Sequence, residues 1–486
     1  MAEQREFQRG LNLFDSTMIV IGSMIGSGIF IVSADIARNV GSAGFLLLVW
    51  VITGFLTLTA ALSYGELAGM MPKAGGQYIY LREAYNPLVG FLYGWTLFLV
   101  IQTGTIAAVA VAFAKFTAVL LPWFSEQHIL FTLYGLEVSA AQLLAIVSII
   151  ILTAVNIGGL KEAKIVQNIF TFTKTIALLS IILLGLFLAS NANAIVTNFS
   201  DFWSASWTKV ENGKIVSIEQ LSGVMILAAL GTAMVGSIFS SDAWNNITFT
   251  AGEVINPKKN IPLSLAIGTG VVTLLYILAN VAYIVVLPIA GTPDATDVVG
   301  RGIQFATSDR VGTAVASLIF GEPAALVMAV LIMISTFGCN NGLILAGARV
   351  YYAMAKDGLF FKKAALLNKH SVPGWALIVQ GIWSSLLCLS GSYGDLLDYV
   401  VFAVLIFYIL TVIGLFILRK KQPNAERPYK AVGYPIIPIV YILLASGICI
   451  DLLIFKPSYT WPGVFIVLSG IPVYFIWKNF SRRNSL

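Results

Sequence analysis

Glycine and serine residues interrupt the first long apolar stretch of the chain. Within residues 21–30, Gly22, Gly26 and Gly28 alternate with Ser23 and Ser27. A helix that breaks at such a run exposes N–H groups that attract an anion and carbonyl groups that attract a cation. The run therefore has the backbone chemistry to hold a small molecule that carries both charges. The alternative is close helix packing, because Gly22-x-x-x-Gly26 is also a common packing pattern.

A second polar run occupies residues 233–246, inside another apolar stretch. It contains Ser240, Ser241 and Asp242, followed closely by two asparagines. The carboxylate of Asp242 has three open roles. It could bind a cationic group of a ligand, exchange a proton, or hydrogen-bond the unwound backbone beside it.

Lys174 is the third candidate for chemistry. It lies about nine residues into an apolar stretch expected at 165–189, which at about 1.5 Å per residue places it near the middle of a spanning helix. An ionisable residue at that depth is a functional hypothesis by default. The alternative is a lysine that faces lipid and extends its ammonium toward the membrane surface.

The elements that position these groups are membrane-spanning helices. Of 486 residues, 58% are hydrophobic and only 11% are charged, whereas a soluble domain has roughly 25% charged residues. Apolar stretches of about 18 residues or more recur along the chain, and each can cross the bilayer as a helix. We predict twelve spans, at about residues 14–36, 44–69, 88–118, 138–157, 165–189, 221–250, 262–289, 324–354, 374–392, 395–418, 434–456 and 461–480.

Several classes of function lack their residues in this sequence. Cys339, Cys388 and Cys449 lie in apolar stretches without ligand-like spacing, which argues against a metal site or a disulfide framework. The net charge of +6 is spread over alternate loops, unlike a nucleic-acid-binding patch. His128 and His370, both in loops, do not form the cluster that a membrane enzyme needs. We therefore expect no enzymatic activity, no cofactor and no metal.

Lysine and arginine concentrate in one set of loops, and such loops face the cytoplasm. Both termini are therefore expected in the cytoplasm, with the chain in the cell membrane. Glu66 and Glu253, near cytoplasmic helix ends close to Lys73 and Lys258, are expected to be gate or loop-anchoring charges, or plain ion pairs. The expected organisation is a tail at 1–13, a first repeat at 14–189, an outer loop at 190–220, a second repeat at 221–418, two helices within 434–480 and a tail at 481–486.

Broken helices at corresponding positions of two halves point to a transporter binding site. Several motifs, in order from about residue 10 to about residue 450, together resemble the amino acid–polyamine–organocation permeases, and are most similar to the L-type branch. They are GSGIF at 26–30, YGEL at 64–67, PKAGGQY at 72–78, EAY at 83–85, GEVINP at 252–257, NIP at 260–262, STFG at 335–338, NG at 341–342 and RPYK at 427–430.

The resemblance implies an all-α membrane fold. Spans 1–5 and 6–10 would form a 5+5 inverted repeat with broken helices 1 and 6, and the last two helices would be peripheral. It also implies a sodium-independent secondary carrier with alternating access, which moves neutral L-amino acids by exchange or proton-linked uptake. A carrier of cationic amino acids or polyamines is the alternative, and Asp242 favours it because the branch usually has small residues there.

The family's site residues carry over by position. Backbone amides near Ser27, Gly28 and Ile29 would hold the substrate carboxylate. Carbonyls near Met24 and Ile25 and around Ile238 and Phe239 would hold its ammonium. Phe239 also matches an aromatic residue that closes over the substrate in the family, although packing is its other reading.

Lys174 matches a lysine of this branch that replaces the sodium ion of sodium-coupled relatives. Its ammonium is expected to bridge the carbonyls around Gly22 and Ser23 and the hydroxyl of Ser335. Eukaryotic light subunits of the branch have a cysteine after span three that binds a heavy subunit. Residues 119–137 contain no cysteine, so we expect no disulfide-linked heavy subunit.

Overall fold

The computed structural model describes residues 6–133, 136–211, 213–321, 323–389 and 393–483, and in these the chain is mostly helical. The helices of the first half are α1 Leu13–Met24, α2 Ser33–Val40, α3 Ala43–Met70, α4 Gln77–Ala84, α5 Pro87–Thr96, α6 Gln102–Leu120, α7 Ala140–Gly158, α8 Leu160–Phe187 and α9 Ala192–Ser200. Those that follow are α10 Val224–Ser240, α11 Asn246–Phe249, α12 Pro257–Val286, α13 Val298–Arg301, α14 Val311–Phe320, α15 Ala324–Lys356, α16 Gly374–Leu387, α17 Tyr393–Lys421, α18 Ile436–Phe455 and α19 Pro457–Arg483.

Ten helices in the described part of the chain are long and apolar enough to cross a membrane. Three shorter apolar helices are α10, α14 and α16. Two of these, α10 and α16, fall where the sequence predicts the sixth and ninth spans. The sixth is short because its helix ends at Ser240, in the polar run.

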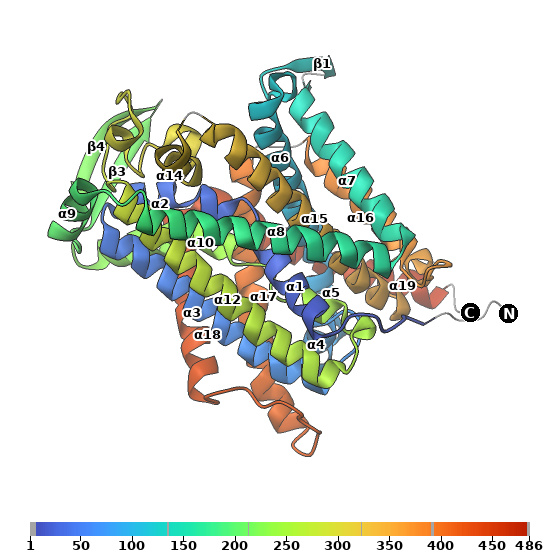
Figure 1. The fold of residues 1–486 in the computed structure, drawn as a ribbon. Helices are drawn as coiled ribbons and strands as arrows, with labels where there is room; N and C mark the ends of the chain where they lie inside the picture. Colours follow the sequence, from blue (N-terminus) through green and yellow to red (C-terminus); the bar gives the residue numbers. More distant parts are fainter. Residues whose placement is uncertain (1–5, 134–135, 212, 322, 390–392, 484–486) are drawn as a thin grey trace.

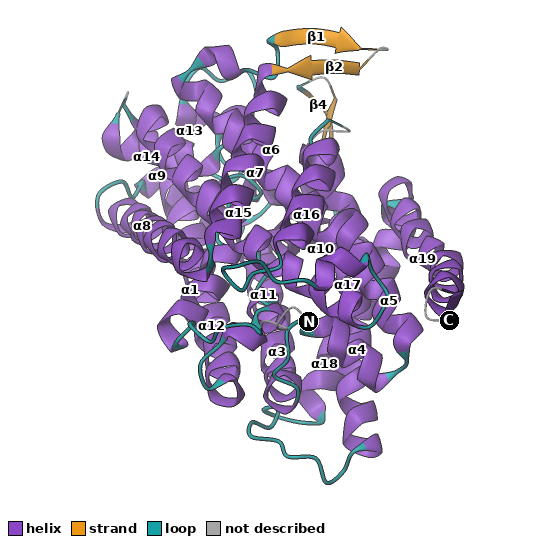
Figure 2. Ribbon diagram, turned by 90° about the vertical axis from the view of Figure 1, so that its right-hand side faces the viewer, coloured by secondary structure: helices purple, strands orange, loops and turns teal. Residues whose placement is uncertain are grey.

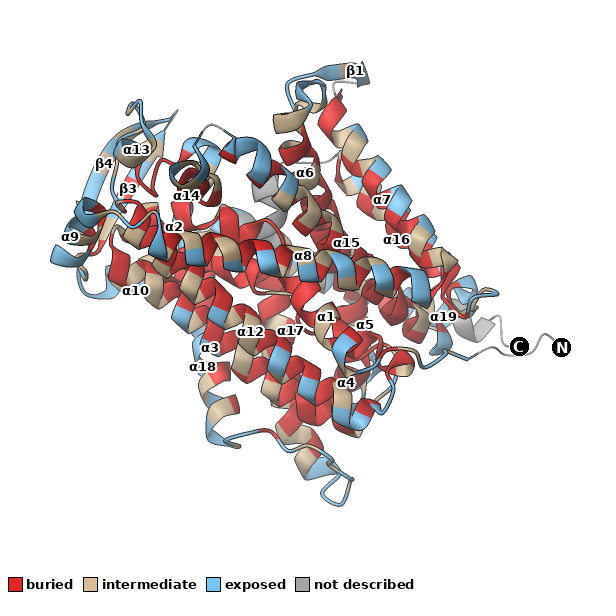
Figure 3. Ribbon diagram, viewed as in Figure 1, coloured by how far each residue is buried: buried red, intermediate tan, exposed pale blue. Residues whose placement is uncertain are grey.

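The surface of α8 shows why these helices need a membrane. Ile169 and Phe172 are more than half exposed, whereas Gln167, Thr171 and Lys174 on the same helix are buried (Figure 3). Polar side chains therefore face the protein and apolar ones face outward. Water would penalise that arrangement, and a hydrocarbon surrounding favours it.

The helices form one bundle around α1. Helices α8, α12 and α15 all pack against α1, and α3 runs beside α12 (Figure 1). Helix α19 lies at the outer edge, against α5 and α17 (Figure 2). The short α1 is thus enclosed by long helices, which hold its C-terminal end inside the protein.

The loops depart from a purely helical fold in two places. One antiparallel hairpin pairs β1 Ile129–Leu133 with β2 Leu136–Ser139, and a second pairs β3 Ser206–Glu211 with β4 Lys214–Gln220. The second hairpin and α9 lie at the opposite end of the bundle from α19 (Figure 1). Neither hairpin is predicted from the sequence, because short strands in the loops leave no long apolar stretch.

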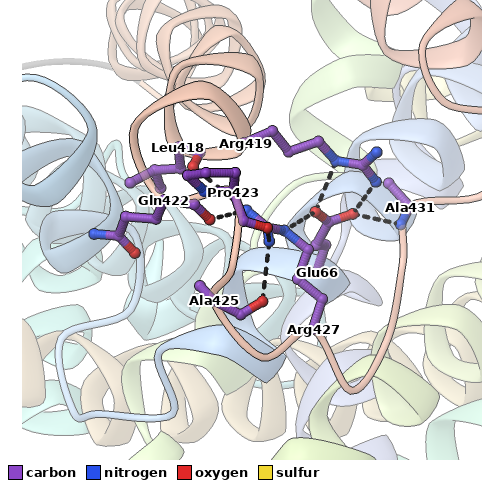
Figure 4. A network of polar contacts seen from close by, with 8 residues as sticks. All are labelled: Glu66, Leu418, Arg419, Gln422, Pro423, Ala425, Arg427 and Ala431. Carbon is purple, nitrogen blue, oxygen red and sulfur yellow. Dashed lines mark hydrogen bonds and ion pairs between the residues drawn. The ribbon is translucent and has the colours of Figure 1, made fainter.

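Glu66 anchors the segment between α17 and α18. Its fully buried carboxylate accepts hydrogen bonds from Arg419 Nε and Nη2 at 2.9 and 2.6 Å, from Arg427 Nε at 3.1 Å and from the Ala431 amide at 2.7 Å. Figure 4 shows these donors converging on the carboxylate. Lys73, which lies close to Glu66 in the sequence, is not among these donors. A buried carboxylate needs several donors, and the two arginines supply them.

Candidate functional site

The first span is interrupted within the glycine and serine run. Helix α1 ends at Met24, and Ile25 is extended, with φ −75° and ψ 100°. A single helical turn follows at Gly28–Phe30, before α2 begins at Ser33. The last carbonyls of α1 and the first amides of the next turn therefore lack partners inside a continuous helix.

The sixth span is interrupted in the same way. Helix α10 ends at Ser240, and the short α11 begins only at Asn246. Between them, Ala243 has a φ of +64°, a conformation that few residues other than glycine adopt. Such a strained residue persists only where the surrounding structure holds it.

The two breaks are in direct contact. A Cβ atom on Gly28 would lie 2.0 Å from Ser240 Oγ and 3.3 Å from Ser240 Cα, so only glycine fits there. The hydroxyl of Tyr276, on α12, lies 3.1 Å from the Met24 carbonyl and 3.1 Å from the Ser240 carbonyl. One side chain therefore links the C-terminal ends of both half-helices.

Lys174 joins the first break to α15. Its ammonium, 1% exposed, donates to the Gly22 carbonyl at 2.6 Å, the Ile25 carbonyl at 2.5 Å and the Ser335 carbonyl at 3.2 Å. The Ser335 hydroxyl does not accept from Lys174 as expected. It donates instead to the carbonyls of Ile25 and Gly26, at 3.2 and 2.9 Å. Lysine and serine thus bind the same end of α1, where unpaired carbonyls attract a cation.

Gly22 has a packing role as well. A Cβ at this position would lie 2.0 Å from Gln167 Nε2 and 2.2 Å from Thr171 Oγ1, both on α8. The absence of a side chain lets α1 approach α8 closely enough for Lys174 to reach the Gly22 carbonyl. Gly22 therefore serves both helix packing and the hydrogen bond to Lys174. The neighbouring Ser23 carbonyl accepts from the thiol of Cys339 at 3.0 Å, not from Lys174.

The carbonyl oxygens predicted to face a ligand differ in how many further hydrogen bonds they can accept. The Ile25 carbonyl already accepts from both Lys174 and Ser335, which occupies its two lone pairs. The Met24 carbonyl accepts a hydrogen bond from the Tyr276 hydroxyl. The carbonyls of Ile238 and Phe239 accept from the amides of Ser241 and Asp242, at 3.1 and 3.2 Å. The Phe239 carbonyl also accepts from the Ser241 amide, so it has two donors, as the Ile25 carbonyl does. The carbonyls of Met24 and Ile238 thus retain more accepting capacity than that of Ile25.

The carboxylate of Asp242 is bound by a residue of α17. The hydroxyl of Tyr408 donates to its carboxylate at 2.5 Å. Two small cavities of about 10 and 20 Å³ border both Asp242 and Tyr408. Each has roughly the space that one water molecule requires. Sequence reasoning found Asp242 but missed Tyr408, which nothing in the local pattern distinguishes.

A buried ion pair lies on the C-terminal side of the second break, between Glu253 and α15. Arg349 on α15 binds Glu253 through Nε and Nη2, at 3.0 and 2.8 Å, and both side chains are at most 2% exposed. Lys258, which lies close to Glu253 in the sequence, pairs with Glu426. The sequence signal that was missed is a lone arginine within a long apolar helix.

Two broken helices that meet inside a bundle with an apolar surface, beside a buried lysine, define a membrane transport protein. The sequence profile of the family described as "Amino acid permease" matches residues 11–476. Large neutral amino acids transporter small subunit 2 of Homo sapiens is 32% identical over 476 residues, which cover 97% of this chain and 81% of that protein. The b(0,+)-type amino acid transporter 1 of Mus musculus is 29% identical over 479 residues, which cover 98% and 89%.

The chain belongs to the amino acid permease family, within the amino acid–polyamine–organocation superfamily. The L-type branch predicted from the motifs is confirmed by these relatives.

Tyr276→Phe should slow amino-acid transport about tenfold, because it removes the hydroxyl that links Met24 to Ser240. One lost hydrogen bond between buried groups costs roughly 1–1.5 kcal/mol. Initial uptake rates in proteoliposomes measure the effect. Tyr283→Phe is the matched control on the same helix, since its hydroxyl makes a longer bond of 3.3 Å to Ile29. Equal rates for Tyr276→Phe and the wild type would contradict a linking role.

Proposed function

We propose that this protein is a sodium-independent secondary carrier of neutral L-amino acids that works by alternating access, either by exchange or by proton-linked uptake. The single observation that carries the proposal is the position of Lys174. Its fixed positive charge joins the carbonyl end of α1 to α15 through three hydrogen bonds. A mobile sodium ion would be redundant at a place that a lysine ammonium already fills.

The two breaks supply groups for both ends of an amino acid. Amides of Ser27, Gly28 and Ile29 lie at the start of a helical turn, where N–H groups favour a carboxylate. In the proposed site, the carbonyls of Met24, Ile238 and Phe239 accept the ammonium, and the Ile25 carbonyl holds Lys174. Phe239, 9% exposed, is the proposed aromatic cover.

The proposed architecture has twelve spans. Spans 1–5 and 6–10 form the two inverted halves, α18 and α19 are peripheral, and both termini are cytoplasmic. The boundaries are those of the sequence analysis, with repeats at 14–189 and 221–418. Supporting this, the helical segments before and after each break correspond in order.

Uptake into proteoliposomes tests the function. Purified protein is reconstituted in sodium-free buffer, and uptake of a panel of labelled amino acids is measured with or without unlabelled substrate inside, and with or without an inward proton gradient. Uptake that requires internal substrate identifies an exchanger. Uptake driven by the proton gradient alone identifies a symporter. A strict sodium requirement, or no uptake of any amino acid, would refute the proposal.

Asp242 favours a second candidate, a carrier of cationic amino acids or polyamines. Its carboxylate lies within the second break and borders two cavities. Against this candidate, the carboxylate is already bound by Tyr408 at 2.5 Å, as a structural anchor would be.

For Asp242→Asn we expect neutral amino acids to retain uptake within about threefold of the wild type, because an asparagine oxygen still accepts from Tyr408. Uptake of labelled leucine and lysine, measured in parallel, distinguishes the candidates. A selective loss of lysine uptake of tenfold or more would make Asp242 a substrate ligand and favour the cationic carrier. Tyr408→Phe, which removes the hydroxyl and leaves the carboxylate, is the companion variant.

The carrier is proposed to act without a disulfide-linked heavy subunit. The human relative is named a small subunit, but residues 119–137 of this chain contain no cysteine. In the described part of the chain, Cys339, Cys388 and Cys449 are all buried and free. Uptake by the purified single chain, and identical migration on reducing and non-reducing gels of membranes from its native host, would agree with this proposal.

A further inference from the structure

A cavity separate from the two breaks lies in the segment between α12 and α15. Its volume is about 670 Å³, and its lining includes residues of α13, α14 and the connections around them. Binding pockets for small molecules commonly fall between 300 and 1,000 Å³. The cavity belongs to the stretch at 290–323 that the sequence predicts outside the membrane.

Two arginines that form no direct ion pair among the described residues line this cavity. Arg301 donates Nε to the Ala295 carbonyl at 2.8 Å and Nη1 to the Thr307 hydroxyl at 3.0 Å. Arg310 lies over the ring of Phe116, 5.1 Å from its centroid, and its buried Nε has no hydrogen-bond acceptor among the described residues. Neither arginine takes part in any ion pair found among the described residues.

Arg38 has the carboxylate partners that Arg310 lacks among the described residues. Burial would lower the pKa of Arg38, but Asp309 and Asp35 outweigh it and raise the pKa. Arg38 reaches Asp309 through two hydrogen bonds of 2.7 and 3.1 Å. Burial lowers the pKa of Arg310, and the charge of Glu126 offsets this only in part. Arg310 is a partly desolvated cation that an anion in the cavity would compensate.

The cavity lining also includes a group that can attract the positive end of a zwitterion. Asp297 is exposed at the cavity, and its Oδ1 caps α13 by accepting from the Gly300 amide at 2.8 Å. Its carboxylate can therefore attract an ammonium group. Thr313 and Ser317 add hydroxyl groups on α14. An α-amino acid carries the carboxylate and the ammonium that this set of charges recognises.

The cavity also lies next to the proposed transport site. A Cβ on Gly312 of α14 would lie 2.7 Å from the ring of Phe30, the last residue of the helical turn after the first break. Helix α14 thus faces the cavity with Thr313 and Ser317 and the first break with Gly312. A ligand in the cavity is one helix away from the broken span.

We propose that this cavity is a second amino-acid site, at the outer entrance, in which Arg310 and Arg301 bind the α-carboxylate and Asp297 attracts the ammonium. The inference rests on the proposed function and deepens it. The site captures substrate from the outer solution before the substrate reaches the broken helices. Its contribution is therefore to affinity from one side of the membrane and not to the rate of transport.

The kinetic test uses Arg310→Gln and Arg301→Gln. In intact cells, each variant should raise the KM for outside substrate about tenfold, as the loss of a charge-assisted hydrogen bond implies, with kcat unchanged. In inside-out vesicles the KM should not change. Lys209→Gln is the matched control, because it removes a positive charge from the same end of the protein, outside the cavity. An unchanged outside KM in both variants, or an equal rise from both sides, would overturn the proposal.

A labelling test measures binding of an amino acid in the cavity and does not depend on transport. Thr313→Cys places a thiol on the cavity wall, and the three native cysteines are buried. The neutral amino acid with the largest uptake in the panel, or leucine if none is transported, should slow its reaction with a membrane-impermeant maleimide. Adding Arg310→Gln should raise the half-protecting concentration about tenfold, whereas Lys214→Cys, on the exposed β4 hairpin, should not be protected at all.

Absence of protection at Thr313→Cys, or protection by inorganic phosphate but not by the amino acid, would overturn the second site. The proposed function fails separately, if wild-type protein shows no uptake of any amino acid. Protection with transport absent would support the cavity site and reject the carrier.

Discussion

Lys174→Ala is expected to reduce amino-acid transport by about 100-fold or more. The substitution removes three hydrogen bonds from one buried ammonium and leaves the carbonyls of Gly22, Ile25 and Ser335 converging on an empty space. Hydrogen bonds to a charged group are each worth roughly 1.5–3 kcal/mol, and about 1.4 kcal/mol changes a rate tenfold. Initial uptake rates in proteoliposomes, normalised to the amount of folded protein, measure the loss.

The matched control is Lys161→Ala. Lys161 lies on the same helix, α8, but is exposed. Its loss should change the rate by less than about twofold. The alternative from the sequence, a lysine extending along the lipid, predicts equal rates for both variants. Equal rates would also remove the argument for sodium independence, because that argument depends on Lys174 alone.

The break positions could be predicted because their cause is local. Glycines and serines weaken a helix wherever they occur, so the interruptions after Met24 and after Ser240 follow from residue types in a single run. Lys174 could be predicted because a charge deep in an apolar stretch needs a partner. Its partners differ from the prediction in two details. Lys174 binds the carbonyl of Ile25 and not that of Ser23. The Ser335 hydroxyl donates to Ile25 and Gly26, so that the Ser335 carbonyl accepts from Lys174.

The links between distant segments could not be read in the same way. Tyr276 is one of 18 tyrosines, and its contact with both breaks depends on how α12 crosses α1 and α10. Glu66 has basic residues nearby in the chain, yet it binds Arg419 and Arg427, more than 350 positions away. Nearest charges in sequence are poor predictors of pairs when helices cross a bilayer and loops from different spans meet. Arg349 is different, because its isolation in a long apolar helix was a signal that could have been used.

Arg349→Ala is expected to lower the free energy of unfolding by about 3–5 kcal/mol, the usual cost of removing one partner of a buried ion pair. Arg349 and Glu253 are both at most 2% exposed, and the pair is bidentate. The substitution leaves the Glu253 carboxylate without its counter-charge. Denaturant unfolding in detergent micelles, followed by tryptophan fluorescence, measures the change. Glu426→Gln is the control, because its pair with Lys258 is exposed and should contribute less than about 1 kcal/mol.

A double variant separates the charge from the contact. Replacing Glu253 and Arg349 together by methionine removes both charges and keeps an apolar contact of similar size, so much of the lost stability should return. If the double variant is as unstable as Arg349→Ala, the ion pair stabilises the fold through its hydrogen bonds and not only because each charge neutralises the other. Recovery of stability without recovery of transport would mean that the pair, which ties the segment after the second break to α15, is needed to move between states. Recovery of both would make it an anchor only.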